Sequence, residues 1–266
     1  MERINERKGT SVPKKGLSSG FGPMDKLTTG WHKGNLILIA GRPAMGKTLF
    51  ALNLIKNVAI RDRKPVGFFS VGTTRRQFTD RMLSVMYGVP SEEIYNDSRQ
   101  LVHRMRDLQD APIYIDDSPS LALSTFYDRA LKWVRQRGVR LIIVDDLRLI
   151  EYDGMPRGNC QEEMEMVSRS LKRMAMELNV PIIALSQLAR RTGNGEEEKL
   201  NRPQMDDLRK SGNMDRPADV VCFIHRPGYY KAFSSADGKD SRDVTQIIVA
   251  KNKNGATGQI ALQLAT

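Results

Sequence analysis

The chain has 266 residues, 40% of them hydrophobic, which is enough for one large α/β domain with a buried core. Lysine and arginine number 42 against 31 aspartates and glutamates, and the net charge of +11 fits either a polyanion partner such as nucleic acid or a generally basic soluble protein. Aromatic residues make up 6%, too few for an extended base-stacking platform, so phosphates should dominate any contact with a strand. No apolar run approaches the roughly 18 residues of a membrane span, and the charged N-terminus lacks a signal peptide's apolar stretch.

The cysteines and histidines exclude a zinc site at the level of sequence. Cys160 and Cys222 are the only cysteines, lie far apart, and fit no metal-binding spacing. The histidines His32, His103 and His225 do not cluster with them. Two isolated cysteines indicate a reducing compartment, so we expect a cytoplasmic protein with no membrane partner.

The order of elements predicts a doubly wound, mostly parallel sheet. Residues 1–20 contain scattered glycines, prolines and serines and are expected to be a linker, followed by one domain over residues 21–266. From there, apolar strand-like runs alternate with helical patterns, which is typical of α/β folds. The expected strands are Leu36–Ala40, Val66–Val71, Pro112–Ile115, Leu141–Val144, Pro181–Leu185, Val220–Ile224, Thr245–Ala250 and Gln259–Leu264.

Four helices and two loops complete the expected layout. The helices are Lys47–Ile60, Arg75–Tyr87, Leu123–Arg137 and Glu162–Leu178, the last with an apolar face at spacings of three and four residues. The last two strands have only Lys251–Gly258 between them and should form a hairpin. Glycine-containing stretches at Glu151–Asn159 and Arg190–Arg209 are expected to be mobile loops.

The segment Gly41–Thr48 carries the strongest chemical signal. It satisfies the phosphate-loop pattern G-x-x-x-x-G-K-[ST] and lies between an apolar strand and a helix, where backbone N–H groups can turn inward onto phosphate oxygens. Lys47 would meet the β- and γ-phosphates, and the Thr48 hydroxyl would hold Mg²⁺. The sequence therefore predicts Mg-ATP as ligand, bound by Gly41, Arg42, Pro43, Ala44, Met45, Gly46, Lys47, Thr48 and Leu49.

Two further strand ends carry polar residues that fit the same site. The strand Leu141–Val144 runs into Asp145 and Asp146, and an acid there holds Mg²⁺ in phosphate-loop proteins. Because side chains alternate along a strand, only one of the pair can face the site, and we expect it to be Asp145. Gln187 ends another strand, where it either senses the γ-phosphate or is an ordinary polar strand end.

From about Gly16 onward the chain resembles the C-terminal RecA-like motor domain of replicative DNA helicases of the DnaB family. Several separate motifs in the family's order carry this resemblance. They are Ser19–Gly30, Gly41–Asn53, Ile115–Pro119, Ser168–Lys172, Glu177–Pro181, Ala184–Leu188, Asp207–Arg209, Ser211-Gly212, Ala218–Val220 and Ala250-Lys251 with Asn254-Gly255.

The resemblance implies an ATP-dependent DNA helicase that works as a hexameric ring in replication. ATP would lie between subunits, with Lys47, Asp145 and Gln187 acting in one subunit and Lys251 and Lys253 reaching in from its neighbour. Single-stranded DNA would occupy the central channel, and other replisome proteins are possible partners. The DNA contacts would come from the loop of Arg209, Lys210, Ser211 and Gly212.

Three departures from the family pattern bear on catalysis and assembly. Gly72 stands where family members carry the glutamate that activates water, a group worth roughly 10²–10⁴-fold in rate. Lys253 stands where they carry an arginine that grips the phosphate in two places. The 266 residues also contain nothing that resembles the family's large N-terminal collar domain.

Two rival functions remain open on the sequence. A hydrolysis-deficient relative that binds nucleotide and DNA, or regulates a helicase ring, is favoured by Gly72 and Lys253. A recombination or circadian-clock ATPase shares the fold but not the run from Asp207 to Gly212.

Overall fold

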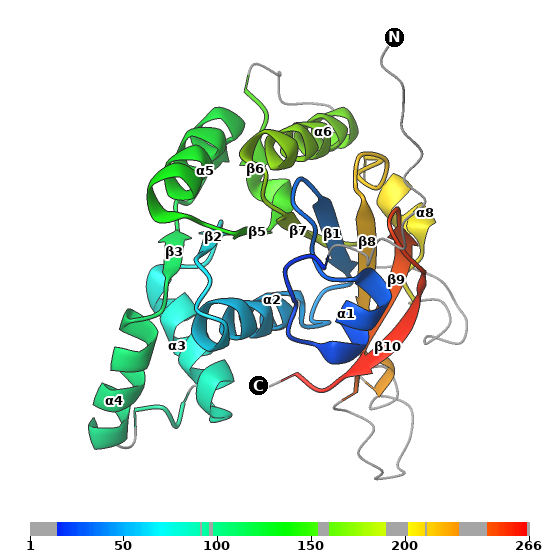
Figure 1. Ribbon diagram of the computed structural model, residues 1–266. Coiled ribbons are helices and arrows are strands. Elements are labelled where there is room, and N and C mark those ends of the chain that lie inside the picture. Colours follow the sequence, from blue (N-terminus) through cyan, green and yellow to red (C-terminus); the bar gives the residue numbers. More distant parts are fainter. Residues whose placement is uncertain are drawn as a thin grey trace, which may run out of the picture.

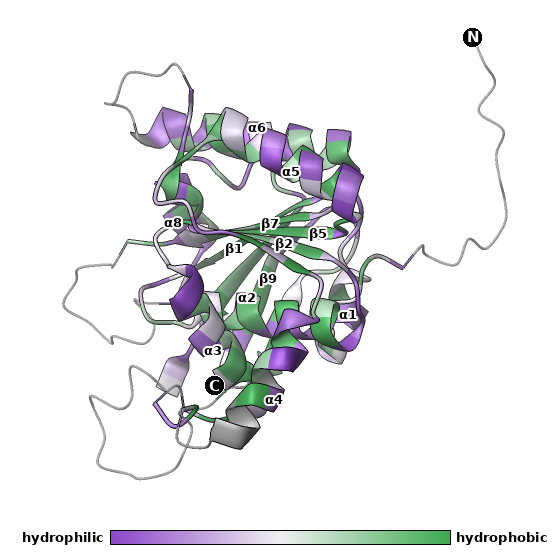
Figure 2. Cartoon of the chain, turned by 90° about the vertical axis from the view of Figure 1, so that its left-hand side faces the viewer, coloured by the Kyte–Doolittle hydropathy of each residue, from purple (hydrophilic) through white to green (hydrophobic). Residues whose placement is uncertain are grey.

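An eight-stranded sheet forms the centre of the molecule in the computed structural model, in the order β10-β9-β8-β1-β7-β5-β2-β3. Helices cover both faces of this sheet (Figure 1, Figure 2). The α/β fold predicted from the sequence is therefore confirmed. The residues that the structure describes are 15–90, 92–95, 98–153, 160–189, 202–210, 212–228 and 244–264.

Six parallel strands build the body of the sheet, and an antiparallel hairpin closes one edge. The central strands are buried on both faces, which is why they are continuous apolar runs rather than alternating ones. The parallel strands are β1 (Leu36–Gly41), β2 (Val66–Ser70), β3 (Ile113–Asp116), β5 (Leu141–Asp145), β7 (Ile182–Gln187) and β8 (Val220–His225); the hairpin is β9 (Thr245–Asn252) with β10 (Gly258–Leu262).

The helices divide between the two faces and bury two separate apolar clusters. On one side lie α5 (Leu123–Arg137) and α6 (Cys160–Leu178), together with the short strands β4 (Leu121–Ala122) and β6 (Ile150–Glu151), and η2 (Leu147–Leu149) precedes β6. On the other side lie α1 (Gly22–Thr28), α2 (Lys47–Ile55), the π-helical turn η1 (Lys56–Arg61), α3 (Arg75–Tyr87) and α4 (Ser98–Gln109). Within the described part of the chain, no helix is long and apolar enough to cross a membrane.

Most element boundaries agree with the sequence prediction, and three do not. The expected loop over Arg190–Arg209 ends in a helix, α8 (Met205–Arg209), because a capping box and the fully buried Leu208 stabilise this turn. The expected turn Lys251–Gly258 is shorter, since Lys251 belongs to β9 and Gly258 to β10. The expected helix Lys47–Ile60 changes to π-helical geometry at Lys56. Residues 190–201 and 154–159, in the two predicted loops, lie outside the described residues.

The packed body already includes residues just before position 21. Leu17 pairs with Trp31 through backbone hydrogen bonds of 2.7 and 2.8 Å, and Trp31 is buried. Asp25 accepts hydrogen bonds from the Ser18 hydroxyl (2.6 Å) and the Ser19 N–H (2.8 Å). Residues 1–14 lie outside the described part, so their role as a linker stays a prediction.

Candidate nucleotide-binding site

The phosphate loop leaves the carboxyl end of β1 and turns into α2. Gly46 has φ of 87°, a conformation that suits glycine, and Ala44 also has a positive φ of 61°. Among the described residues, no side chain caps the N-terminus of α2, so its first N–H groups have no capping partner there. A helix N-terminus of this kind attracts anions through its N–H groups and its dipole.

Lys47 lies folded over the phosphate loop. Its Nζ donates to the backbone oxygens of Gly41 and Arg42, both at 3.2 Å. Burial lowers the pKa of Lys47, while the carboxylates of Asp146 and Asp145 act in the opposite direction. A cation held by weak carbonyl contacts in a partly desolvated site is well placed to bind a phosphate.

Asp145 meets Thr48 at the same edge of the sheet. The Thr48 hydroxyl donates to Asp145 Oδ2 at 2.6 Å, which brings together the end of β5 and the first turn of α2. Burial raises the pKa of Asp145, Asp146 adds to the rise, and the hydrogen bond from Thr48 opposes it. A hydroxyl beside a carboxylate supplies the oxygen ligands that Mg²⁺ prefers. The described residues contain no group of three His, Cys, Asp or Glu that could hold a metal by themselves.

The prediction that Asp146 turns away from the site is wrong. Strand alternation does not govern this residue, because β5 ends at Asp145. Asp146 acts on Lys47 more strongly than Asp145 does, and it also accepts from Arg148 at 3.2 Å. Both carboxylates therefore contribute negative charge around Lys47.

We expect Asp145→Asn to raise the thermal stability of the nucleotide-free, Mg²⁺-free protein. A carboxyl whose pKa is raised on folding stabilises the protein at low pH, and this contribution is lost as pH rises through the raised pKa. The melting temperature should thus increase at neutral pH, by roughly 2–4 °C per 1 kcal/mol gained, and the gain should shrink on acidification. Thermal melts of both proteins across pH measure this.

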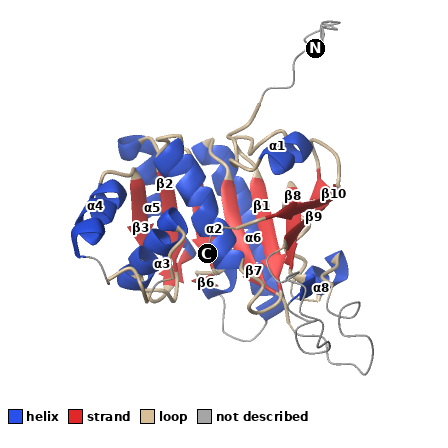
Figure 3. Ribbon diagram, turned by 90° about the horizontal axis from the view of Figure 1, so that it is seen from below, coloured by secondary structure: helices blue, strands red, loops and turns tan. Residues whose placement is uncertain are grey.

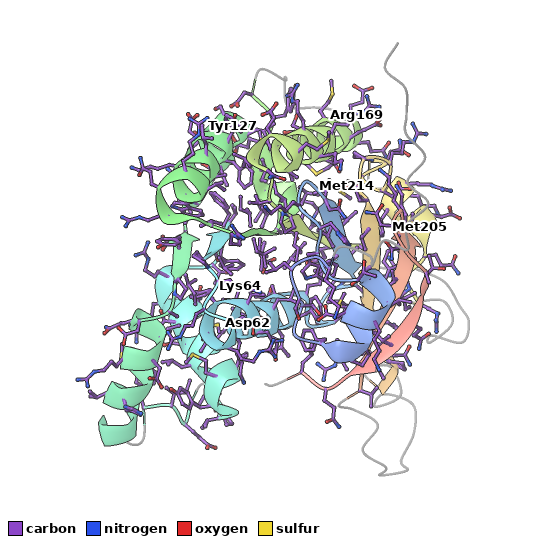
Figure 4. All side chains as sticks on the ribbon, viewed as in Figure 1. Asp62, Lys64, Tyr127, Arg169, Met205 and Met214 are labelled. Atoms are coloured by element: carbon purple, nitrogen blue, oxygen red, sulfur yellow. The ribbon has the colours of Figure 1, made fainter. Side chains whose placement is uncertain are left out.

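The matched control is Asp62→Asn on the protein surface, where Figure 4 labels Asp62 beside Lys64. The hydrogen bond from Arg61 lowers the pKa of Asp62, so removing this charge should bring no gain at neutral pH. Equal melting temperatures for wild type and Asp145→Asn at all pH values would contradict the prediction.

Gln187 and Gly72 lie at the same carboxyl edge of the sheet. Gln187, the last residue of β7, pairs in register with Gly41, where the phosphate loop begins. Ser70, the last residue of β2, pairs with Asp145, which puts Gly72 two residues beyond this pair. Gly72 has φ of 89°, and a Cβ there would lie 3.4 Å from Leu149 Cδ1.

The structure does not bring Lys251 and Lys253 to the phosphate loop of their own chain. Lys253 Nζ lies 3.0 Å from Asp219 Oδ1, and the other oxygen of Asp219 accepts from Leu36 N–H at 2.9 Å and from Lys172 Nζ at 2.6 Å. Leu36 begins β1 and the loop follows its end, so roughly 16 Å of strand separates Lys253 from the loop. Lys251 Nζ donates to the backbone oxygens of Asp215 (2.6 Å) and Arg216 (3.1 Å).

The predicted DNA-contact residues lie at the opposite end of the sheet from α1, around α8 (Figure 3). The Arg209 side chain is 58% exposed and pairs with Asp206 (3.1 Å) and Asp215 (3.7 Å). Lys210 is exposed, and its carbonyl accepts from Gln161 Nε2 at 2.9 Å. Gly212 packs against α6, with φ of 112° and a Cβ position only 2.5 Å from Gln161 O. Ser211 lies outside the described residues.

Sequence reasoning missed one pair of charged residues beside the site. Arg42, inside the phosphate loop, forms an ion pair of 3.0 Å with Asp207 on α8, and both side chains are less than 5% exposed. Each residue falls within a motif that the sequence shows. A pairing between positions so far apart along the chain leaves no local pattern.

Comparison with known proteins identifies the group to which this arrangement belongs. The sequence model of the family described as DnaB-like helicase C terminal domain matches residues 16–266. The chain is a member of this family. The replicative DNA helicase DnaB of Geobacillus stearothermophilus is 35% identical over 98% of this chain, and the replicative DNA helicase DnaC of Bacillus subtilis (strain 168) is 34% identical over 98%. The chain spans 57% of the length of each of these two relatives.

Solved structures of the family share the same architecture. The ATPase domain of one DnaB-like helicase matches with a TM-score of 0.83 and 28% identity, over 93% of this chain and 87% of that one. A DnaB-like replicative helicase, solved in a study of its interactions with primase, matches with a TM-score of 0.81 and 29% identity, over 93% of this chain and 59% of that one. The prediction of a RecA-like helicase motor fold is thus confirmed.

Proposed function

We propose that this domain is the ATP-driven motor of a replicative DNA helicase, binding Mg-ATP and single-stranded DNA. The observation that carries the proposal is the phosphate loop at the N-terminus of α2, with Lys47 over it and the Thr48–Asp145 pair beside it. Membership in the DnaB family supports DNA as the substrate.

Each site residue has a role that follows from its position. The N–H groups of Gly41–Leu49 and the Lys47 ammonium bind the phosphates and orient them at the carboxyl edge of the sheet. Thr48 and Asp145 would hold Mg²⁺, which when bound neutralises charge on the phosphate oxygens. Gln187 borders the loop where a γ-phosphate would end. Lys251 and Lys253, at the far edge of the sheet, would act on the site of a neighbouring subunit in a hexameric ring.

A steady-state ATPase assay with and without single-stranded DNA tests the proposal. A DNA-stimulated rate supports the motor function. Nucleotide and DNA binding without measurable turnover would instead favour the hydrolysis-deficient module, for which Gly72 and Lys253 are the structural arguments. Absence of nucleotide binding would remove both functions.

The partners and location follow from the same proposal. A solved relative is named for its interactions with primase, and we extend that class of partner, a replisome protein, to this chain. Replication in the cytoplasm is the location we propose.

Binding to single-stranded DNA should be independent of sequence and should weaken steeply with salt. The net charge of +11 and the exposed cations Arg209 and Lys210 point to phosphate contacts, whose counterions are released on binding. Replacing both residues by glutamine should lower the slope of log K against log salt by about 0.7 for each phosphate that is no longer neutralised. Fluorescence anisotropy with a labelled oligonucleotide at several salt concentrations measures this.

The control for this experiment is Arg61→Gln, which removes one positive charge on η1, away from α8. Its salt slope should equal that of the wild type. Binding that does not respond to salt, or that is absent at low salt, would contradict the prediction.

We expect the 266-residue chain to self-associate weakly by itself. The cation placed to reach a neighbour, Lys253, is already paired with Asp219 in its own chain. These 266 residues also contain nothing like the collar that helps hold the ring in the family. Light scattering should show monomers or a concentration-dependent mixture, whereas a stable hexamer at low micromolar concentration without nucleotide would be the contrary result.

A further inference from the structure

The buried ion pair between Arg42 and Asp207 joins two segments that the proposed function assigns to different ligands. Arg42 belongs to the phosphate loop, and Asp207 to the helix α8 that leads into the DNA-contact loop. Their Nη2 and Oδ2 atoms lie 3.0 Å apart, with the side chains 3% and 4% exposed. A buried charge is very unfavourable without its partner, so the two groups are constrained to stay together.

Each member of the pair is tied to its own site by a second contact. The backbone oxygen of Arg42 accepts from Lys47 Nζ at 3.2 Å, so this residue touches the principal phosphate ligand at one end and α8 at the other. The carboxylate of Asp207 also accepts from Gln204 N–H at 2.9 Å, which caps the first turn of α8. A shift of the phosphate loop is therefore carried directly to the start of α8.

The contact continues from α8 into the loop that would face DNA. Arg209, one half-turn beyond Asp207, pairs with Asp215 at 3.7 Å across this loop. Met214, labelled in Figure 4, is fully buried and is held at its carbonyl by the Ser168 hydroxyl (3.0 Å) and at its sulfur by the Ser186 hydroxyl (3.8 Å). Ser186 precedes Gln187 on β7, so the loop is anchored to the nucleotide edge at a second point.

We propose that the Arg42–Asp207 pair is a positioning device that couples nucleotide binding to DNA binding within one subunit. A phosphate competes with the carbonyl oxygens of Gly41 and Arg42 for the Lys47 ammonium. The resulting adjustment of the loop moves Arg42, and with it Asp207 and the DNA-contact loop. This inference rests on the proposed function, because it requires that the chain bind both ligands.

The test measures coupling rather than activity. The dissociation constant of a labelled single-stranded oligonucleotide is measured with and without a non-hydrolysable ATP analogue, and that of the analogue with and without DNA, in the full chain at one oligomeric state. The two ratios must agree by thermodynamic linkage, and coupling between sites is typically about 5–150-fold. We expect the wild type to fall in this range.

The decisive variants keep the fold and remove the charges. Asp207→Asn retains an acceptor for Gln204 N–H, and the double variant Arg42→Met with Asp207→Leu replaces the pair by apolar groups, a change that buried ion pairs often tolerate. Both should bring the ratio close to one. Asp206→Asn, whose side chain is 66% exposed in the same helix, should keep the wild-type ratio.

Each outcome decides between coupling and a merely structural role. If the double variant melts like the wild type and keeps its ratio, the pair only fills space and the inference is overturned. A wild type that binds both ligands with a ratio of one also overturns it. A wild type that binds no DNA removes the proposed function, and this inference with it, and is distinguished from the other outcomes by the first titration. If Asp207→Asn fails to fold, the double variant carries the test.

Discussion

Replacing Lys47 by alanine is expected to abolish nucleotide binding while leaving the fold intact. The Lys47 ammonium is the principal cation at the phosphate loop, and removing one partner of a desolvated charge pair costs about 3 kcal/mol or more, roughly a hundredfold in Kd. Folding should not suffer, because burial already disfavours the charged form of this side chain, as its lowered pKa indicates. Titration with a fluorescent ATP analogue, alongside a thermal melt, measures both effects.

Lys56 provides a matched control for this variant. It lies on η1, directly after α2, and burial lowers its pKa as it does that of Lys47. Its Nζ donates to the Val85 carbonyl at 2.7 Å, on the α3 side rather than at the loop. Lys56→Ala should bind the analogue like the wild type. Unchanged affinity in Lys47→Ala would contradict the assignment of Gly41–Thr48 as the nucleotide site.

The parts of the fold that could be predicted are those set by local sequence. The strands β1, β5 and β8 are unbroken apolar runs, and α3 and α5 match their predicted limits residue for residue because each ends at a glycine in the left-handed conformation, Gly88 and Gly138. The phosphate loop was predictable for the same reason, since its pattern and its flanking strand and helix are contiguous.

What could not be predicted depends on contacts between distant segments. The short helix α8 was missed because its stability comes from the Asp207 cap and the burial of Leu208 rather than from an apolar period. The expected position of Asp146 was wrong because strand alternation does not extend one residue past the end of β5. That Lys253 is held by Asp219 follows from the register of β8 with β9, which no single segment reveals.

The largest predicted effect on catalysis concerns the missing general base. Gly72 lies at the carboxyl edge beside Asp145, in the strand-end position where the family carries its glutamate. Among the described acids nearby, Asp116 is committed to Arg129 and Ser118, which hold its pKa below the ordinary value although burial opposes them. Asp117 accepts from Arg75 N–H at 2.9 Å. We therefore expect slow turnover in the wild type, even with DNA and saturating nucleotide.

Gly72→Glu should raise kcat, and the structure defines both its limit and its control. The φ of 89° at this position costs a side chain roughly 1–2 kcal/mol, and the new Cβ meets Leu149 at 3.4 Å, so part of the gain from a base of about 10²–10⁴-fold will be lost to strain. Gly72→Gln carries the same strain but cannot take a proton. The ratio of kcat between the glutamate and glutamine variants, from phosphate release under single-turnover conditions, isolates the contribution of the base.

Lys253→Arg should add to this gain only where subunits meet, because Lys253 is far from the phosphate loop of its own chain. Both groups would act on one γ-phosphate, so the double variant should depart from additivity in assembled protein and not in monomers. A wild-type kcat already within about 1–10³ s⁻¹ would contradict the expectation of slow turnover. Another base would then have to act, and Asp146, which lies close enough to influence both Lys47 and Asp145, is the first residue to replace by asparagine.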